Sequence, residues 1–548
     1  MKKLLCLVLA LILCVGLLVG CGAKEEVKEE AGEEVSAAVS STGAEVGQLN
    51  TSGSSTKDSK ATPPPAEAQF QKELTVLLDD KVTLISPFNA GSKSSQQGQV
   101  YHMMYDTLID WNLDGDYVPC LATEWSASED SKVWTFKLRD DVYFHNGEHF
   151  TADDVVFTWE FALEAAGTGI FDRAKAMESV TALSDYEVEI KLYDTNPDFE
   201  YDMANIAGFV ICNREACEAD PEEGPVIATG PYYVDDFKTS EYIVYKKWDK
   251  YFGEDKPVSD QITFRYVAEE TARYIMLEND EATFGVINSV YIPQFASDER
   301  FVMVSQCNNN CGYIALNMSR QPMDDINFRW ACAYAVSRDE IVDVAFAGFS
   351  QKHPTGGIWG WTTAYSNPDI PDITQDVEKA KEYLAKSNYD GRTLQIFAAM
   401  PHTKKIAAVV MSQLTAVGIN CEVCECDGPT LSLRSKFDNN DMDIIVNAAI
   451  FGPTAQAIRY EIELTDNNKA CWVNDEAIDL IGKAAITPNG DERQAMYYRI
   501  QEIMYDEQPY IPTTHNVIYA AGQKGCGGVK MYSTAFNDYS CAYRIIED

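Results

Sequence analysis

One long apolar run opens the chain and decides where the rest of it can fold. Leu4–Val19 follows the cationic residues Lys2 and Lys3 and ends in small residues. This layout is typical of a secretory signal peptide. A transmembrane helix is the alternative, since the run is close to the lower limit of roughly 17–25 residues for spanning a bilayer. The small residues before a cysteine at the end of the run favour the first interpretation, so residues 1–20 are predicted to be a signal peptide. No second run approaches that length, so the rest is predicted to be a soluble, exported body.

A cysteine lies directly after this run, in Leu18-Val19-Gly20-Cys21. The tetrapeptide resembles the lipobox of bacterial lipoproteins. That resemblance implies that Cys21 is acylated through its sulfur and becomes the first mature residue. Each buried methylene of an acyl chain contributes about 0.8 kcal/mol, so two or more chains give stable attachment. The implied location is the extracytoplasmic face of the cell membrane, through a lipid anchor.

The stretch behind this cysteine has the composition of a disordered segment. Residues 21–72 are rich in Glu, Ala, Ser, Gly, Thr and Pro, and Phe70 is their one aromatic residue. Such a stretch cannot bury enough surface to offset the entropy of ordering it. We therefore predict a flexible tether that begins at the lipidated Cys21, with a reach on the order of 40 Å for about 50 residues.

The length and charge of the remainder limit its architecture and its partners. Residues 73–548 exceed the roughly 250–300 residues at which one hydrophobic core stops growing, which predicts two or more domains. The net charge of −41 argues against nucleic acid, because phosphate contacts need clustered Lys and Arg. It also disfavours anionic ligands, while its simplest role is to keep the surface solvated.

The cysteines of the body allow two interpretations. An exported protein in oxidising surroundings is expected to pair many of its cysteines. The spacing here specifies no pairing, and unpaired thiols would instead indicate a reducing, anaerobic habitat. Twelve cysteines follow Cys21, at positions 120, 212, 217, 307, 311, 332, 421, 424, 426, 471, 526 and 541.

Hydrophobic periodicity predicts a mixture of strands and helices. Strands are predicted at 74–78 and, from alternating apolar residues, at 132–139 and 188–192. Thr151 and Asp154 have capping-box spacing, which predicts a helix from there. Further helices are predicted at 326–346 with Asp325 as the cap, at 376–386, and at 403–417 before Gly418, with a strand at 419–423. Helices alternating with strands indicate α/β or α+β lobes.

Several short motifs follow one another along the body in a characteristic order. They are Tyr105-Asp106-Thr107-Leu108-Ile109, Gly115, Pro119, Leu121-Ala122, Trp125, Trp134–Arg139, Phe144-His145-Asn146-Gly147, Thr151–Phe157, Thr229-Gly230-Pro231-Tyr232-Tyr233, Trp248–Gly253, Leu316-Asn317, Asp325, Arg329, Ala331, Ala335, Arg338 and Ile341-Val342. In order and spacing they resemble the dipeptide-, oligopeptide- and nickel-binding proteins of bacterial ABC importers, solute-binding protein family 5. The resemblance covers nearly all of residues 73–548.

The resemblance implies a periplasmic-binding-protein-like α/β (α+β) fold of two lobes joined by hinge strands, with an extra subdomain inserted in the first lobe. Lobe one would comprise 73–85, 228–311 and 512–548, the inserted subdomain 86–227, and lobe two 312–511. A peptide or peptide-like solute would be enclosed between the lobes. Closure would then present a face to the permease and ATPase subunits of an importer. The implied protein is a monomer and not an enzyme, with no catalytic residues, cofactor or metal site.

One segment departs from the family pattern. Peptide binders of the family often follow an Asp-led strand with a tryptophan and an aspartate that contacts the free amine of the peptide. Here Asp443-Ile444-Ile445-Val446 supplies the strand, but residues 447–453 contain neither residue. A buried ammonium without that carboxylate would be uncompensated at a cost of several kcal/mol. Recognition of a free amino terminus is therefore less firmly implied than the fold.

Other residues are candidates for ligand contact by their chemistry. Trp359 and Trp361 lie in the Gly-rich segment 356–361, where their indoles could contact a peptide or sugar or could simply pack as a plug on the lobe surface. Arg459 could pair with a ligand carboxylate, or serve the surface. The full set of candidates is Trp359, Trp361, Asn447, Phe451, Arg459 and Tyr460.

Two patterns imitate metal sites. His145 and His149 spell H-x-x-E-H, but zinc proteases of that type need both on one helical face, and here they flank Gly147 in a predicted turn. Cys421 and Cys424 differ in strand parity and so should point to opposite faces, and Cys307 with Cys311 is the other close pair. Core or free thiols are the favoured interpretation.

Three other functions stay open. The chain could bind a non-peptide solute such as a sugar or metal complex, or it could act as a ligand sensor with the same fold. A secreted hydrolase on a lipoprotein stalk is the third, but the sequence has no serine elbow and no phosphate-binding glycine loop.

Overall fold

The computed structural model describes residues 64–89, 97–112, 116–287, 291–360, 363–450, 454–532 and 537–546. The predicted signal peptide, Cys21 and most of the predicted tether lie outside these residues. Within the described part of the chain, no helix is both long enough and apolar enough to cross a membrane. Strands and helices alternate along it, as the sequence predicts.

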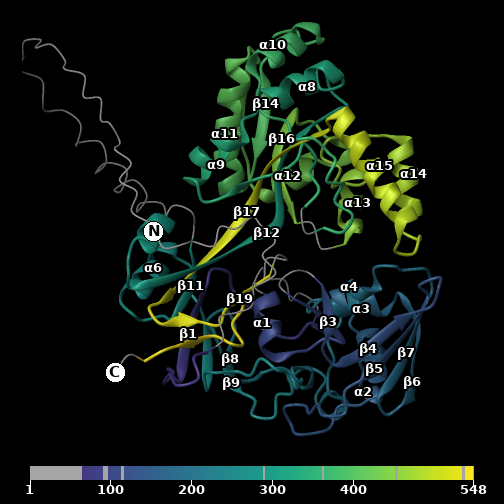
Figure 1. Ribbon diagram of the computed structural model, residues 1–548, viewed down its shortest axis with the longest axis vertical. Helices are drawn as coiled ribbons and strands as arrows, with labels where there is room; N and C mark the ends of the chain where they lie inside the picture. Colours follow the sequence, from purple (N-terminus) through teal and green to yellow (C-terminus); the bar gives the residue numbers. More distant parts are fainter. Residues whose placement is uncertain are drawn as a thin grey trace, which may run out of the picture. The chain divides into compact units, whose positions relative to one another are not determined.

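A mixed sheet of eleven strands runs through the described chain (Figure 1). Its pairs are parallel at β1–β10, β1–β11, β14–β15 and β14–β16, and antiparallel elsewhere. In spatial order the strands are β15 (Cys421–Glu425), β14 (Leu394–Ala398), β16 (Ile444–Ile450), β12 (Phe301–Leu316), β17 (Tyr510–Gln523), β11 (Phe284–Ile287), β1 (Glu73–Leu78), β10 (Gln261–Tyr266), β9 (Tyr242–Lys247) and β8 (Tyr232–Lys238), with β13 (Gln351–Lys352) beside β17.

The two longest strands, β12 and β17, connect the halves of this sheet (Figure 1). They pair with each other from Phe301–Gln523 at one end to Ala315–Tyr510 at the other, with register shifts around Cys311. The 519–522 part of β17 pairs with β11, whereas the 310–316 part of β12 pairs with β16. These strands therefore carry the chain from one lobe to the other, as the family resemblance implies for hinge strands.

A separate antiparallel sheet has the order β4 (Ala122–Ala127), β5 (Val133–Leu138), β7 (Glu187–Leu192) and β6 (Met177–Ser184). The strands predicted at 132–139 and 188–192 are confirmed, each with alternate side chains buried. Helix α2 (Ala152–Ala162) begins after Thr151, whose N–H donates to the Asp154 carboxylate over 2.9 Å, so the predicted capping box is also confirmed.

The described chain contains further short elements. Helices here are α1 (Gln97–Met104), α3 (Gly169–Ala174), α4 (Phe199–Ala204), α5 (Arg214–Ala219), α6 (Glu270–Glu278), α7 (Ile292–Ala296), α12 (Gly428–Arg434) and α13 (Arg459–Ile462), with 3-10 turns η1 (Gly224–Val226), η2 (Phe437–Asn439) and η3 (Ala455–Ile458). Strand pairs are β2 (Ile109–Trp111) with β3 (Tyr117–Pro119), β18 (Cys526–Gly527) with β21 (Tyr543–Arg544), and β19 (Lys530–Met531) with β20 (Asn537–Asp538).

The single helix predicted at 326–346 is wrong, because the chain forms two helices there. Helix α8 spans Ile326–Ala335 and α9 spans Arg338–Phe346. Val336 is extended, and the Ser337 hydroxyl accepts from the Glu340 N–H, which starts the second helix. The Gln413 side chain also bonds the Ser337 N–H and C=O. Serine competes for backbone partners in this way, and that is why it favours a cap over a helix interior.

The other predicted helices of this region are confirmed. Helix α10 spans Val377–Lys386 with Asp376 as its cap, and α11 spans Pro401–Ala416. Gly418, at φ +99°, ends the segment before β15, and α14 (Asp475–Ala484) and α15 (Asp491–Glu507) follow later.

The part of the sheet formed by β12, β14 and β16 is buried on both faces. Alternate residues of a strand point to opposite faces, and the side chains divide accordingly between two apolar clusters. Ile314 and Ile444 join residues of α8, α10 and α11 in one cluster, whereas Tyr313 and Ile445 join residues of α14 and α15 in the other. Helices therefore cover both faces here (Figure 1).

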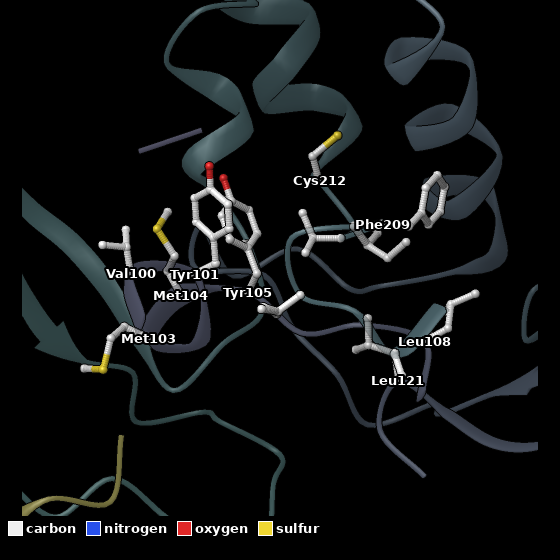
Figure 2. Packing of buried hydrophobic residues seen from close by; sticks show 14 of the residues in the cluster. Val100, Tyr101, Met103, Met104, Tyr105, Leu108, Leu121, Phe209 and Cys212 are labelled. Carbon is white, nitrogen blue, oxygen red and sulfur yellow. The ribbon is translucent and has the colours of Figure 1, made fainter. Parts of the chain in front are cut away.

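The early family motifs pack against one another. Figure 2 shows Tyr105 of the first motif with Met104, Leu108 and Cys212 in one buried apolar cluster. The Thr229 hydroxyl donates to the Asp106 carboxylate over 2.7 Å. Gly230 lies so close to Met104 that an added Cβ would be 2.4 Å from its carbonyl carbon. These motifs thus pack the predicted inserted subdomain against the predicted lobe one.

The two ends of the described chain meet in space. Phe70 forms a β-bridge with Ile545, and its ring lies 5.4 Å from that of Tyr543. The Gln71 N–H donates to the Arg544 carbonyl over 2.8 Å. The last residues of the predicted tether are therefore joined to the C-terminal segment.

Candidate ligand-binding site

Trp359 is the predicted candidate that the structure describes most fully. Its side chain is buried in the apolar cluster of α14 and α15. The indole N–H donates to the Ala364 carbonyl over 3.2 Å, and the ring packs edge-on against Tyr497 at 5.8 Å. The indole is packed here, in line with the alternative considered for it, and ligand contact by Trp359 stays a prediction. Trp361 lies outside the described residues.

The candidates at and after β16 have separate surroundings. Asn447 is half-buried and lies opposite Tyr313, and its amide donates to the Tyr313 hydroxyl over 3.3 Å. Arg459 is exposed and pairs with Glu463 one turn later at 2.5 Å, which is the surface role considered for it. Phe451 and the side chain of Tyr460 lie outside what the structure describes. Ligand contact by these residues stays a prediction.

A buried acid lies on the same short helix. Glu461 of α13 is 6% exposed, and burial raises the pKa of its carboxyl to about 8. Among the described residues its Oε2 has no hydrogen-bond partner. The carboxyl is therefore protonated and uncharged at neutral pH, and it could donate to a ligand carbonyl. The sequence offered one weak signal, an acid between the apolar residues Ile458 and Ile462 in a short segment.

A second set of residues, missed by the sequence analysis, links α15 to α4. Both guanidinium nitrogens Nη1 and Nη2 of Arg493 donate to the two carboxylate oxygens of Asp198, over 2.9 and 2.6 Å. The Arg493 side chain is fully buried and that of Asp198 is 14% exposed. Charge-assisted bidentate pairs are among the strongest polar contacts in proteins. This one joins the predicted lobe two to the predicted inserted subdomain.

The guanidinium of Arg493 is also held in place by residues of the predicted lobe two. Tyr365 and Tyr497 stack at 5.4 Å, and the guanidinium lies within 6 Å of both rings. Its Nε donates to the Ala484 carbonyl, and Nη1 also donates to the Asn489 side chain. Burial opposes the charge, but the bonds to Asp198 outweigh it and raise the pKa of Arg493. The arginine is thus preorganised for its partner.

Asn489 adds a second contact between the same two segments. Its amide donates to the Pro197 carbonyl over 2.9 Å, and the Tyr365 hydroxyl donates to its side-chain oxygen over 2.9 Å. Arg493, Asn489, Tyr365 and Tyr497 form one hydrogen-bonded and stacked unit, which we call the Arg493 clamp. The clamp also touches Trp359 through Tyr497, so it connects a predicted ligand residue to the contact with Asp198.

The H-x-x-E-H motif does not bring its histidines onto one metal. His145 Nε2 lies 3.0 Å from the Gly230 carbonyl, whereas His149 Nε2 lies 2.8 Å from the Asp140 carbonyl. Burial lowers the pKa of His145 to about 4. Gly147 between them has φ +90°, so the pair flanks a turn, as predicted.

The described cysteines form no disulfide. The expectation that many are paired is therefore wrong for this part of the chain, and the alternative of reduced thiols describes it better. Burial raises the pKa of several of these thiols, Cys332 and Cys526 among them, which keeps them protonated and unreactive. The side chain of Cys307 lies outside the described residues.

Comparison with known proteins places the chain in a family. The model of the bacterial extracellular solute-binding proteins, family 5 (middle region), matches residues 116–468. The dipeptide-binding protein of Escherichia coli is 26% identical over 477 residues, 78% of this chain and 86% of that protein. Heme-binding protein A of Haemophilus influenzae is 27% identical over 478 residues, 78% of this chain and 83% of its own length.

A solved structure agrees over its whole length. The crystal structure of the ABC transporter substrate-binding protein CtaP from Listeria monocytogenes is 25% identical, with a TM-score of 0.78. The match covers 87% of this chain and 100% of CtaP. With the two-lobed fold and the family model in agreement, the chain belongs to family 5 of the bacterial extracellular solute-binding proteins.

Proposed function

We propose that this protein is an extracytoplasmic substrate-binding lipoprotein that captures a peptide or peptide-like solute between two lobes and delivers it to an ABC importer. The observation that carries the proposal is the match to CtaP, which extends over that entire transporter protein. Strands β12 and β17 supply the connection on which two lobes can close. The partners are the solute and the permease and ATPase subunits, and the protein acts as a monomer without catalysis or cofactor.

The anchor completes this proposal. Cys21, acylated at its sulfur, holds the protein on the membrane, and the Ser- and Glu-rich stretch behind it lets the body reach the permease. The predicted division of the body into lobe one, inserted subdomain and lobe two belongs to the same proposal.

The ligand class rests on a comparison of relatives with this chain's own residues. One relative is named for dipeptides and another for heme, at nearly the same identity to this chain. Overall sequence similarity therefore does not distinguish between these two classes of ligand. Glu461 is uncharged at neutral pH, and residues 447–453 lack an acid. We therefore propose a peptide or peptide-like ligand whose binding does not depend on a charged amino terminus.

The test is to identify what the protein carries and how it responds. Material released on unfolding the purified protein is identified by mass spectrometry, and the identified ligand is returned to the emptied protein. X-ray scattering with and without it should report compaction, because the lobes close on the ligand. Binding without compaction would contradict the two-lobe mechanism, and a released sugar or porphyrin would contradict the peptide assignment.

Calorimetry decides the role of the amino terminus. A peptide ligand and its N-acetylated form should bind within about threefold of each other, roughly 0.6 kcal/mol. A penalty on the order of 2–5 kcal/mol would instead reveal a buried partner for the ammonium group. In that case the Glu461→Gln variant shows whether Glu461 is this partner.

A further inference from the structure

Three fully buried side chains with metal-binding atoms meet beside the crossing of β12 and β17. They are Cys311, His353 and His515, each 0% exposed. One ligand atom from each, the thiol sulfur and a ring nitrogen of each histidine, lies within 4.8 Å of the other two. Cys311 is not part of a disulfide. The three residues are far apart in the sequence, so no motif with a fixed spacing predicts the site.

The strand register explains why they meet. Cys311 of β12 lies opposite His515 of β17, at the point where the pairing of these strands shifts register. On its other side, His515 pairs with Gln351 of β13. His353 follows β13 directly, and its N–H donates to the Thr513 carbonyl over 3.1 Å. Its ring therefore stacks on that of His515, with centroids 4.6 Å apart.

The surroundings of His353 are those of a metal-binding imidazole. Its Nε2 lies 2.9 Å from the Trp359 carbonyl, which can only accept. Its Nδ1 accepts from the Thr355 N–H over 3.3 Å and lies 3.2 Å from the Thr355 carbonyl. With the proton on Nε2, a metal ion would replace this N–H as the partner of Nδ1. Histidines that bind metals almost always donate their other ring N–H to a carbonyl or carboxylate in this way.

We propose that Cys311, His353 and His515 bind a transition-metal ion of the zinc class. Two imidazoles and one thiolate suit zinc or copper, whereas calcium and magnesium require oxygen ligands. At zinc distances of about 2.0–2.3 Å, tetrahedral ligand atoms lie roughly 3.3–3.8 Å apart. The three atoms therefore need to approach by at most about 1–1.5 Å, and the fourth position takes a water or backbone carbonyl. The sulfur loses its proton when the metal binds.

The nearby charge is balanced. Arg338 donates to the His353 and Thr355 carbonyls over 2.8 and 2.6 Å, which brings a positive charge close to the metal. The same guanidinium is paired with Asp372. The thiolate of Cys311 neutralises one of the two positive charges of a divalent ion, which lowers the cost of burying the ion.

A metal here would act on the strands that join the lobes. Its ligands come from β12 and β17 and from the residue that follows β13, so one ion ties these three segments together at their irregular point. No metal site was predicted from the sequence, because Cys311, His353 and His515 are far apart in it and form no recognisable motif. This site is independent of the proposed ligand between the lobes.

The test uses the full chain, reduced and stripped with a chelator. Zn²⁺ is titrated against a chromophoric chelator, and Co²⁺ is added separately because a thiolate ligand gives it a charge-transfer absorption. We expect one tight equivalent of Zn²⁺ and the thiolate band with Co²⁺. Cys311→Ser should remove the band and weaken Zn²⁺ binding at least about 100-fold, and His515→Gln at least about 10-fold.

Matched controls separate this site from other thiols and histidines. Cys332→Ser removes another fully buried thiol and His145→Gln a half-buried imidazole, and both should keep the Zn²⁺ affinity and the Co²⁺ band. Tight binding that survives Cys311→Ser, carried by other residues of a chain with 85 acidic side chains, would overturn the proposal.

A measurement on the unaltered protein covers the case in which the variants do not fold. X-ray absorption at the zinc edge should show one sulfur at about 2.3 Å together with nitrogen at about 2.0 Å. A shell of nitrogen and oxygen alone, or the absence of a tight equivalent in the natural chain, would refute the site.

Discussion

Arg493 donates to both carboxylate oxygens of Asp198 although 295 residues separate them in the sequence. The arginine is completely buried, so removal of either partner would leave the charge of the other uncompensated. Breaking such a pair by removing one partner costs about 3–5 kcal/mol. In a protein that closes around its ligand, a contact of this kind between the two closing segments favours the closed state.

Replacing Arg493 with Met should therefore weaken ligand binding. If the pair forms only on closure, affinity falls about 100-fold or more while the unfolding free energy of the ligand-free protein changes little. Calorimetry and denaturant unfolding measure the two quantities. Arg499→Met is the control, since that arginine lies on the same helix in an exposed pair with Glu476. A large loss of stability with unchanged affinity would show that the pair is permanent and not part of closure.

The pH dependence of stability should report Glu461. Its pKa of about 8 in the folded protein lies above the ordinary value of 4.5, so the folded state holds this proton more tightly than the unfolded one. The stabilisation is complete below about pH 4.5 and is lost as the pH rises towards 8. In the natural protein the unfolding free energy should fall by about a few kcal/mol over this range, and in Glu461→Gln this fall should be absent.

Chemical denaturation at a series of pH values measures this effect. Glu378→Gln, which changes an exposed acid of α10, should leave the profile as it is. A profile for Glu461→Gln that matches the natural protein would show that the Glu461 carboxyl is ionised in the fold.

Cys21→Ser should release the protein from the membrane. The Leu18-Val19-Gly20-Cys21 sequence lies at the end of the predicted signal peptide, and the stretch behind it has no apolar run that could hold a bilayer. The variant should move from the detergent-extracted membrane fraction to the medium or to an unprocessed pool. Unchanged extraction and an unchanged mass of the mature protein would contradict lipidation.

Replacing both His145 and His149 with Ala should affect stability more than binding. His145 is half-buried beside Gly230, and burial of its ring lowers its pKa to about 4. This lowered pKa stabilises the fold above about pH 6.5, and the contribution is lost as the pH falls towards 4. The variant should thus be less stable at neutral pH and less sensitive to acid, while calorimetry should find ligand affinity within about threefold. Loss of a hydrolytic activity in step with loss of zinc would contradict this.

Local pattern predicted much of the fold. The alternation at Trp134 and Phe136 placed β5, and Thr151 with Asp154 placed the start of α2, because these signals depend on neighbours in the sequence. The break at Ser337 was missed, since it depends on Gln413 from a distant helix. Composition alone did not reveal that Trp359 packs on Tyr497.

The contacts that define sites were the least predictable. Arg493 with Asp198, and Cys311 with His353 and His515, are brought together by topology and strand register. The periodicity of a single segment cannot predict contacts between residues so far apart in the sequence. Glu461 gave a faint signal, because this acid lies between Tyr460 and Ile462 in a segment that also contains Ile458.

The bridge between Phe70 and Ile545 has a practical consequence for engineering. Because the two described ends of the body lie side by side, a short linker could join them and new termini could be opened in a surface loop, as neighbouring ends generally allow. Such a circular permutant would keep every strand pairing of the large sheet. A fluorescent reporter fused to the C-terminal end would lie beside the point at which the predicted tether joins the body.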